Sequence, residues 1–98
     1  MDTLRFHGTI NFAPPEVLSG EQYIPKPADI WACGIILYTI LCGEAPFSSF
    51  DQVKRKPYKK PRYKCSGKAL KLLDWMLSKD QNMRPTARQV LDHKWLKV

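Results

Sequence analysis

A carboxylate in an apolar setting is the first candidate for a chemical role in this chain. Asp29 stands directly before residues 30–42, which are almost wholly apolar. One interpretation is a helix N-cap, in which the carboxylate accepts backbone N–H groups of the first turn and favours the positive end of the helix dipole. A second interpretation is that Asp29 holds the backbone of another segment against the start of a buried helix. The residues by themselves leave both open.

The cysteines and histidines do not indicate metal or disulfide chemistry. Cys33, Cys42 and Cys65 are odd in number and form no C-x-x-C pair, and the first two lie in the apolar run. His7 and His93 do not complete a metal-ligand spacing with them. We therefore predict no metal site and expect reduced, buried thiols in an intracellular protein. The N-terminus shows no signal-peptide pattern, and we expect a cytoplasmic location.

The net charge of +7 arises from one segment, residues 54–64, which read KRKPYKKPRYK. One interpretation is a solvated loop; the other is contact with an acidic partner, such as nucleic acid, an anionic membrane or an acidic docking segment. Tyr58 and Tyr63 could stack on bases, and a basic run can also direct nuclear entry. Pro57 and Pro61 argue against a continuous amphipathic helix and so against membrane binding.

The elements that position these residues are predicted to be helices, because no alternation of apolar and polar residues indicates a strand. The first 28 residues read as an irregular loop with one turn of helix after a proline. A central helix follows over residues 29–42, with Gly43 as its C-terminal stop. The remaining elements are a basic loop or short helix over residues 47–65, a helix of about 67–78 capped by Ser66, and a last helix opened by a Thr86–Gln89 capping box.

The central helix is apolar on every face, so we expect it to be buried all round. As a helix its apolar run would span only ~20 Å, short of the ~30 Å hydrocarbon layer, which excludes a membrane span. A chain of 98 residues offers only short helices to cover it. We therefore expect about half of this helix to be covered by the chain itself.

Three stretches together resemble the second half of the C-terminal lobe of a eukaryotic serine/threonine protein kinase. They are GTINFAPPEVL, DIWACG and RPTARQVLDHKWL, in this order and at suitable separations. The family pattern is G-T-x-x-Y/F-x-A-P-E, then D-x-W-x-x-G, then R-P-T and a helix ending in H-x-W. GIILYTILCGEAPF and HKWL look most like the calcium/calmodulin-dependent group. The resemblance implies a mainly α partial kinase domain over residues 1–98, without the N-terminal lobe or the catalytic loop.

The resemblance implies a role for each matched residue. Gly8 and Thr9 resemble the loop that receives the substrate residue after the phosphoacceptor. Glu16 resembles the acid that pairs with the arginine at Arg84. Asp29 resembles the residue that accepts hydrogen bonds from the catalytic-loop backbone.

Trp31, of the same D-x-W-x-x-G motif as Asp29, is expected to support the active site with these residues. The sequence also departs from the family, because Pro14 replaces the alanine of A-P-E and has no backbone N–H to donate.

The motifs that would bind ATP and magnesium are not in this chain. Phosphoryl transfer requires a Gly-rich loop, a strand lysine, an H-R-D loop and a D-F-G aspartate. The sequence contains no G-x-G-x-x-G, H-R-D or D-F-G, and we expect these parts to precede residue 1. The resemblance implies ATP and magnesium for the full-length kinase alone, and no catalytic, cofactor or metal residue in this chain.

Three functional hypotheses follow. The first is part of an active serine/threonine kinase, whose partners are a protein substrate and the remainder of the kinase domain. The second is a non-catalytic kinase-like protein that binds a partner through exposed hydrophobic and basic surfaces. The third is a small basic protein that binds nucleic acid, with an affinity that falls steeply with salt. The three motifs in register favour the first.

Overall fold

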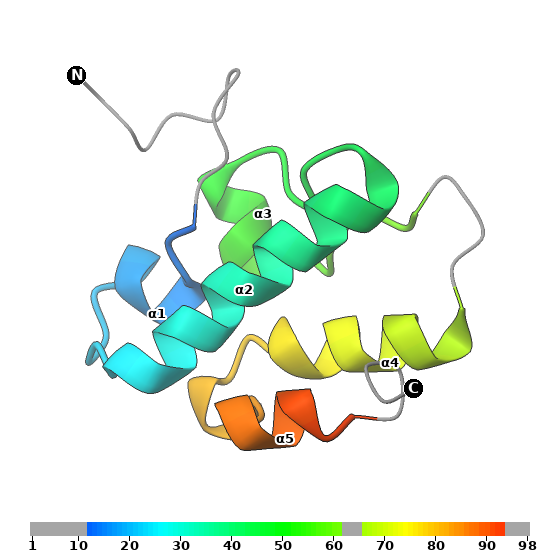
Figure 1. Cartoon of the computed structure of the whole chain (residues 1–98). Helices are drawn as coiled ribbons and strands as arrows, with labels where there is room; N and C mark the ends of the chain where they lie inside the picture. The colour runs from blue at the N-terminus through cyan, green and yellow to red at the C-terminus, as the bar shows by residue number, and fades with distance from the viewer. Residues whose placement is uncertain (1–11, 62–65, 94–98) are drawn as a thin grey trace.

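The fold is an assembly of helices around one long central helix (Figure 1). The computed structural model describes residues 12–61 and 66–93, and these ranges contain no strand. This confirms the mainly α prediction. The elements are α1 (Pro15–Leu18), α2 (Pro25–Cys42), α3 (Phe50–Arg55), α4 (Gly67–Met76), a 3-10 turn η1 (Gln81–Met83) and α5 (Ala87–Leu91).

Helix α2 begins at Pro25, four residues before the predicted start. Pro25 and Pro27 are tolerated because the first turn of a helix has N–H groups without intrahelical partners, and the fixed φ of proline suits it. The N-cap is Ile24, which provides no side-chain hydrogen bond. The N-cap interpretation of Asp29 is therefore wrong, since this residue lies inside the helix.

Helix α2 ends where the sequence predicts. Gly43 has a φ of 73°, in the left-handed region that favours glycine. Its N–H donates to the carbonyl of Thr39 over 2.9 Å and closes the last turn. The capping predictions for the later helices are also confirmed, with Ser66 accepting from the N–H of Ala69. The reciprocal capping box of Thr86 and Gln89 opens α5.

The core lies between α2 and α4. Its buried residues include Trp31, Ile35 and Tyr38 of α2, which pack with Leu73 and Leu77. The two helices approach closely at Gly34, the glycine of DIWACG. A Cβ built there would lie 2.8 Å from Cδ2 of Leu77 and 3.1 Å from Cβ of Met76. The glycine of this motif is therefore a packing requirement.

Part of α2 remains exposed, as expected from the few elements available to cover it. Ile36 is 44% exposed and Ile40 is 74% exposed. Cys42 is buried as predicted, but Cys33 is exposed, so the prediction of a buried thiol at that position is wrong. Cys65 lies outside the described residues. Helix α4 packs along one side of α2 (Figure 1), whereas Cys33, Ile36 and Ile40 lie at positions of α2 that remain exposed.

The predicted basic loop over residues 47–65 is helical in part. Its residues Phe50–Arg55 form α3, which starts at the Ser49 cap, where the side chain accepts from the N–H of Gln52. Residues 62–65 lie outside the described ranges. Among the described helices, none combines the length and the apolar character needed to cross a membrane.

Candidate functional site

The centre of the candidate site is a buried ion pair between Glu16 and Arg84. Nη2 of Arg84 donates to Oε1 of Glu16 over 2.7 Å, and Nη1 donates to Oε2 over 2.8 Å. The side chain of Glu16 is 2% exposed and that of Arg84 is 0% exposed. A planar guanidinium suits this two-pronged contact because its donors match the spacing of the carboxylate oxygens. The resemblance implied this pairing, and the structure contains it.

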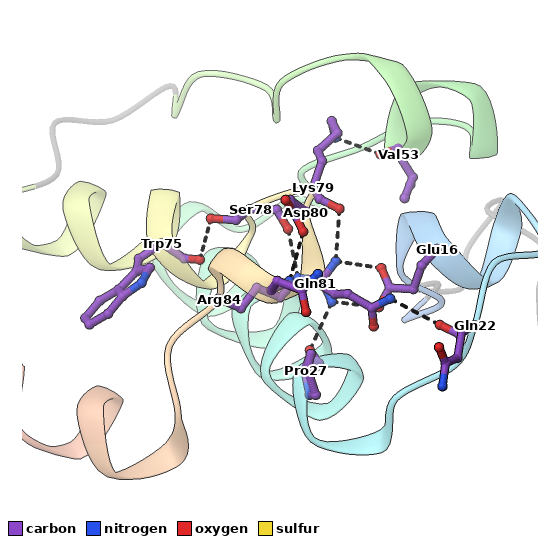
Figure 2. Close-up of polar contacts among 11 residues, drawn as sticks. Glu16, Gln22, Pro27, Val53, Trp75, Ser78, Lys79, Asp80, Gln81 and Arg84 are labelled. Carbon is purple, nitrogen blue, oxygen red and sulfur yellow. Dashed lines mark hydrogen bonds and ion pairs between the residues drawn. The ribbon is translucent and has the colours of Figure 1, made fainter.

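Arg84 also binds three backbone carbonyls, so its donors are well satisfied (Figure 2). Nε donates to Ser78 over 2.8 Å, Nη1 to Pro27 over 3.1 Å, and Nη2 to Lys79 over 3.4 Å. A buried charge needs such partners because the loss of water would otherwise be costly. One guanidinium thus joins α1, the start of α2 and the loop between α4 and η1.

Trp31 lies directly beside this ion pair. The guanidinium carbon of Arg84 is 5.0 Å from the centroid of a Trp31 ring. The Trp31 side chain is fully buried and stacks on Phe47, with ring centroids 5.7 Å apart and planes 12° from parallel. Its indole Nε1 is buried without a hydrogen-bond partner among the described residues. Trp31 therefore contacts both the ion pair and Phe47, with which it forms an aromatic layer.

Lys79 is a second cation on the same aromatic layer. Its Nζ lies 4.4 Å from the centroid of Phe47 and 5.5 Å from that of Trp31, and it donates to the carbonyl of Val53 over 2.7 Å. Burial, followed by the charge of Arg84, lowers the pKa of Lys79 to about 8. The electron-rich ring faces act in the opposite direction, because they favour the cation.

Sequence reasoning missed the part played by Lys79 and Phe47. The two residues are distant in the sequence and meet only through the fold. Phe47 follows α2 in the stretch APF, which in the sequence contributes only to the resemblance to kinases. Lys79 stands among ordinary polar residues, where no spacing marks it. Only the tertiary arrangement identifies this cluster.

The other predicted site residues are placed as follows. Asp29 is exposed on α2, and its carboxylate forms no hydrogen bond or ion pair with a described residue. Gly8 and Thr9, the predicted substrate-site residues, lie outside the described part of the chain. Their assignment, and the proposed contact of Asp29 with a catalytic loop, stay predictions.

The described residues do not fit a nucleotide and magnesium site. In residues 12–61 and 66–93, no group of three or more His, Cys, Asp or Glu side chains could hold a metal ion. The carboxylate of Glu16 is fully engaged by Arg84 and is not available as a ligand. No reaction step through ATP is therefore assigned to the described residues.

Comparison with known proteins agrees with this arrangement. The protein kinase domain family matches residues 2–96. The serine/threonine-protein kinase PSK2 of Saccharomyces cerevisiae is 36% identical over 94 residues, covering 95% of this chain and 8% of PSK2. The SNF1-related protein kinase catalytic subunit alpha KIN12 of Arabidopsis thaliana is 40% identical over 94 residues, covering 90% of this chain and 19% of KIN12.

A solved structure gives the same result. The crystal structure of the Rad53 kinase domain and SCD2 in complex with AMPPNP is similar with a TM-score of 0.79 and 31% identity. The similarity covers 89% of this chain and 38% of the Rad53 chain. The chain thus spans well under half the length of the kinases it matches. The calcium/calmodulin-dependent group stays a prediction. On these matches and on the helical fold, the chain belongs to the protein kinase domain family, as part of its C-terminal lobe.

Proposed function

We propose that this chain forms the wall of the peptide-substrate site and the scaffold beneath the catalytic loop of a serine/threonine protein kinase. The complete enzyme would transfer the γ-phosphate of ATP to a protein serine or threonine. The chain alone is expected to be inactive, because positioning and charge neutralisation are nearly the whole of this catalysis and the motifs for both are not in its sequence.

The observation that carries the proposal is the buried Glu16–Arg84 pair on the face of Trp31. Glu16 is the second residue of α1, which follows in the sequence the segment carrying the predicted substrate-site residues Gly8 and Thr9. Fixing α1 to the core through Glu16 would fix the end of that segment. A substrate residue could then be held in one position relative to the reacting groups, as catalysis by orientation requires.

The exposed side of α2 supports a scaffold role. Ile36 and Ile40 are apolar and exposed, and Asp29 stands on the same helix without a partner among the described residues. An apolar stripe headed by an available carboxylate is suited to covering a segment with backbone N–H groups to satisfy. We propose that the remainder of the kinase domain, including its catalytic loop, is that segment.

A chimeric kinase tests this function. The part of the Rad53 kinase domain that matches residues 12–93 is replaced by these residues, and transfer of labelled phosphate from ATP to a protein substrate is measured. We expect a folded chimera that transfers phosphate. A chimera that binds AMPPNP and melts cooperatively, yet transfers no phosphate, would contradict the proposal.

The variant Asp29→Asn of the chimera tests the scaffold assignment separately. It removes the negative charge with almost no change in shape. We expect AMPPNP binding to be retained and kcat to fall, because Asp29 would act through the catalytic loop and not through the nucleotide. Glu21→Asn is the control, since it removes a carboxylate from an exposed loop between α1 and α2. Equal kcat for Asp29→Asn and Glu21→Asn would contradict the role of Asp29.

A non-catalytic kinase-like protein is the alternative. The exposure of Ile40 favours it, because a partner of another kind could cover the same stripe of α2. The alternative predicts that the chimera is inactive while the chain alone folds and binds a protein. An intracellular location, cytoplasmic or nuclear, is part of both proposals.

A further inference from the structure

The basic segment is fixed to the core in its described part, residues 54–61. The Tyr58 hydroxyl donates to the carboxylate of Asp74 on α4. The Tyr58 ring meets Tyr38 of α2 edge-on, with centroids 5.6 Å apart and planes at 68°. This tyrosine packs against the main hydrophobic cluster. The segment is therefore anchored at Tyr58, while Lys56, Lys59 and Lys60 remain exposed to solvent.

The next residue, Lys59, is held on both sides of its backbone. Its N–H donates to the carbonyl of Pro46 over 2.8 Å, and its carbonyl accepts from the hydroxyl of Tyr38. Its Nζ lies 3.4 Å from Oε1 of Glu44. Two consecutive residues thus bind the segment to α2, to α4 and to the turn after α2. The neighbouring exposed lysines, Lys56 and Lys60, are therefore attached to a backbone that is held in place.

An open hollow of about 520 Å³ lies between this segment and α3. Ser48, Gln52, Lys56 and Lys59 are among its lining residues. The hollow also contains Asp51, but that carboxylate is 3.0 Å from Nε of Arg55 and is compensated there. Besides this carboxylate, the lining presents two ammonium groups, the hydroxyls of Ser48 and Ser49 and the side-chain amide of Gln52. This set complements carboxylates and the polar backbone of an extended chain.

We propose that this hollow binds an acidic, extended peptide segment of a protein partner, with Lys56 and Lys59 contacting its carboxylates. Lys56 is exposed and has no ion-pair partner among the described residues. The contact of Lys59 with Glu44 is long, and a ligand carboxylate can compete with it. The anchoring through Tyr58 reduces the conformational freedom lost on binding, which raises affinity.

Two other classes of partner fit the structure less well. Base stacking on Tyr58 is disfavoured, because its ring and hydroxyl are engaged with Tyr38 and Asp74. Insertion of an apolar helix face into a membrane would need a longer amphipathic helix, and α3 has six residues before the chain turns at Lys56 and Pro57. A peptide needs neither feature.

The test measures the binding of a fluorescein-labelled octaglutamate peptide to the purified chain by fluorescence anisotropy. ATP is left out, so the result of this test does not depend on phosphate transfer. Lys56→Ala and Lys60→Ala are matched variants, because both remove one exposed lysine of the segment and only Lys56 lines the hollow. We expect Lys56→Ala to weaken binding about fivefold and Lys60→Ala less than about twofold.

Tyr58→Phe tests the anchoring without changing the charge. It removes the hydroxyl that binds Asp74, and we expect binding to weaken although every lysine is retained. Near-ultraviolet circular dichroism verifies that each variant keeps its packing. Equal loss in the two lysine variants, with no effect of Tyr58→Phe, would show a flexible polycation and overturn the proposal. Displacement of the peptide by oligouridylate RNA or by phosphatidylserine vesicles at equal charge would overturn it as well.

Discussion

Arg84 and Glu16 lie 68 positions apart in the sequence, yet they form a two-pronged ion pair in the interior. The same guanidinium binds the carbonyls of Pro27 and Ser78 and lies on the face of Trp31. The pair therefore connects both ends of the described chain to its central helix. In a protein kinase domain this connection would hold the substrate side of the lobe against its base.

Removing either partner of this pair is expected to be strongly destabilising. Arg84→Leu leaves the carboxylate of Glu16 buried without a counter-charge, and Glu16→Leu does the same for the guanidinium of Arg84. We expect each to lower the free energy of unfolding by ~3–5 kcal/mol, as measured by urea denaturation. The double variant Glu16→Leu/Arg84→Leu should lose less than the sum of the single variants. Additive losses would contradict direct coupling.

Arg55→Ala is the control for this prediction. Arg55 pairs with Asp51 on α3, but the two side chains are 70% and 64% exposed. An exposed pair of this kind contributes at most ~0.5 kcal/mol because water and salt screen it. We expect an unfolding curve close to that of the unaltered chain.

The close approach of α2 and α4 predicts that Gly34→Ala is destabilising, although alanine favours a helix. The gain in helix propensity is ~0.5–1 kcal/mol, whereas forcing an extra methyl group against Leu77 and Met76 costs ~1–3 kcal/mol. Urea denaturation should therefore show a net decrease in the free energy of unfolding of Gly34→Ala. Gly67→Ala is the control, because nothing lies within 4 Å of a Cβ at that position. If both variants were stabilising, the contact at Gly34 would not be tight.

The lowered pKa of Lys79 predicts that the folded chain becomes more stable as the pH rises into the alkaline range. That pKa is lowered from 10.5 to about 8 in the folded chain. Between these values the unfolded chain binds more protons, so the free energy of unfolding rises as pH increases through this window. The destabilising contribution of the charged form is fully present below pH 8.

Comparison with Lys79→Met measures this contribution. Urea denaturation of both proteins from neutral pH to just below 10 should show that the unaltered chain gains stability relative to the variant. The upper limit avoids Tyr58, whose pKa is raised by burial and by Asp74 and whose titration acts in the opposite direction. If the difference in free energy of unfolding between the two proteins stayed the same over this pH range, the lowered pKa of Lys79 would be contradicted.

The exposed stripe of α2 should respond differently in the chain and in the complete domain. Ile40→Lys is expected to change the stability of the isolated chain by no more than ~0.5 kcal/mol, because the residue already faces water. In the Rad53 chimera the same substitution should lower the melting temperature. Ile35→Lys, at a buried position of the same helix, should destabilise both. If Ile40→Lys left the stability of both the isolated chain and the chimera unchanged, the proposal that the rest of the kinase domain covers this side of α2 would be contradicted.

The sequence predicted those features that depend on local chemistry. Gly43, Ser66 and the Thr86–Gln89 box each act within one turn of helix, so their residue types are sufficient. The start of α2 was predicted too late, because prolines usually interrupt helices and are accepted in the first turn.

Features that depend on distant contacts were beyond sequence reasoning. The exposure of Cys33 depends on which faces of α2 the other elements cover. The contact of Lys79 with Val53 and with the aromatic layer joins separate segments. Glu16 and Arg84 were linked beforehand only through the resemblance to kinases, since nothing in their spacing relates one to the other.

The setting of Trp31 has an optical consequence. Its indole is fully buried, without a hydrogen-bond partner among the described residues, and two cations lie on its aromatic layer. Such a ring should emit at shorter wavelength than an indole in water, and its emission should shift to the red when the surrounding layer opens. In a variant with Trp75 and Trp95 replaced by phenylalanine, the emission of Trp31 would therefore report on the packing around the ion pair.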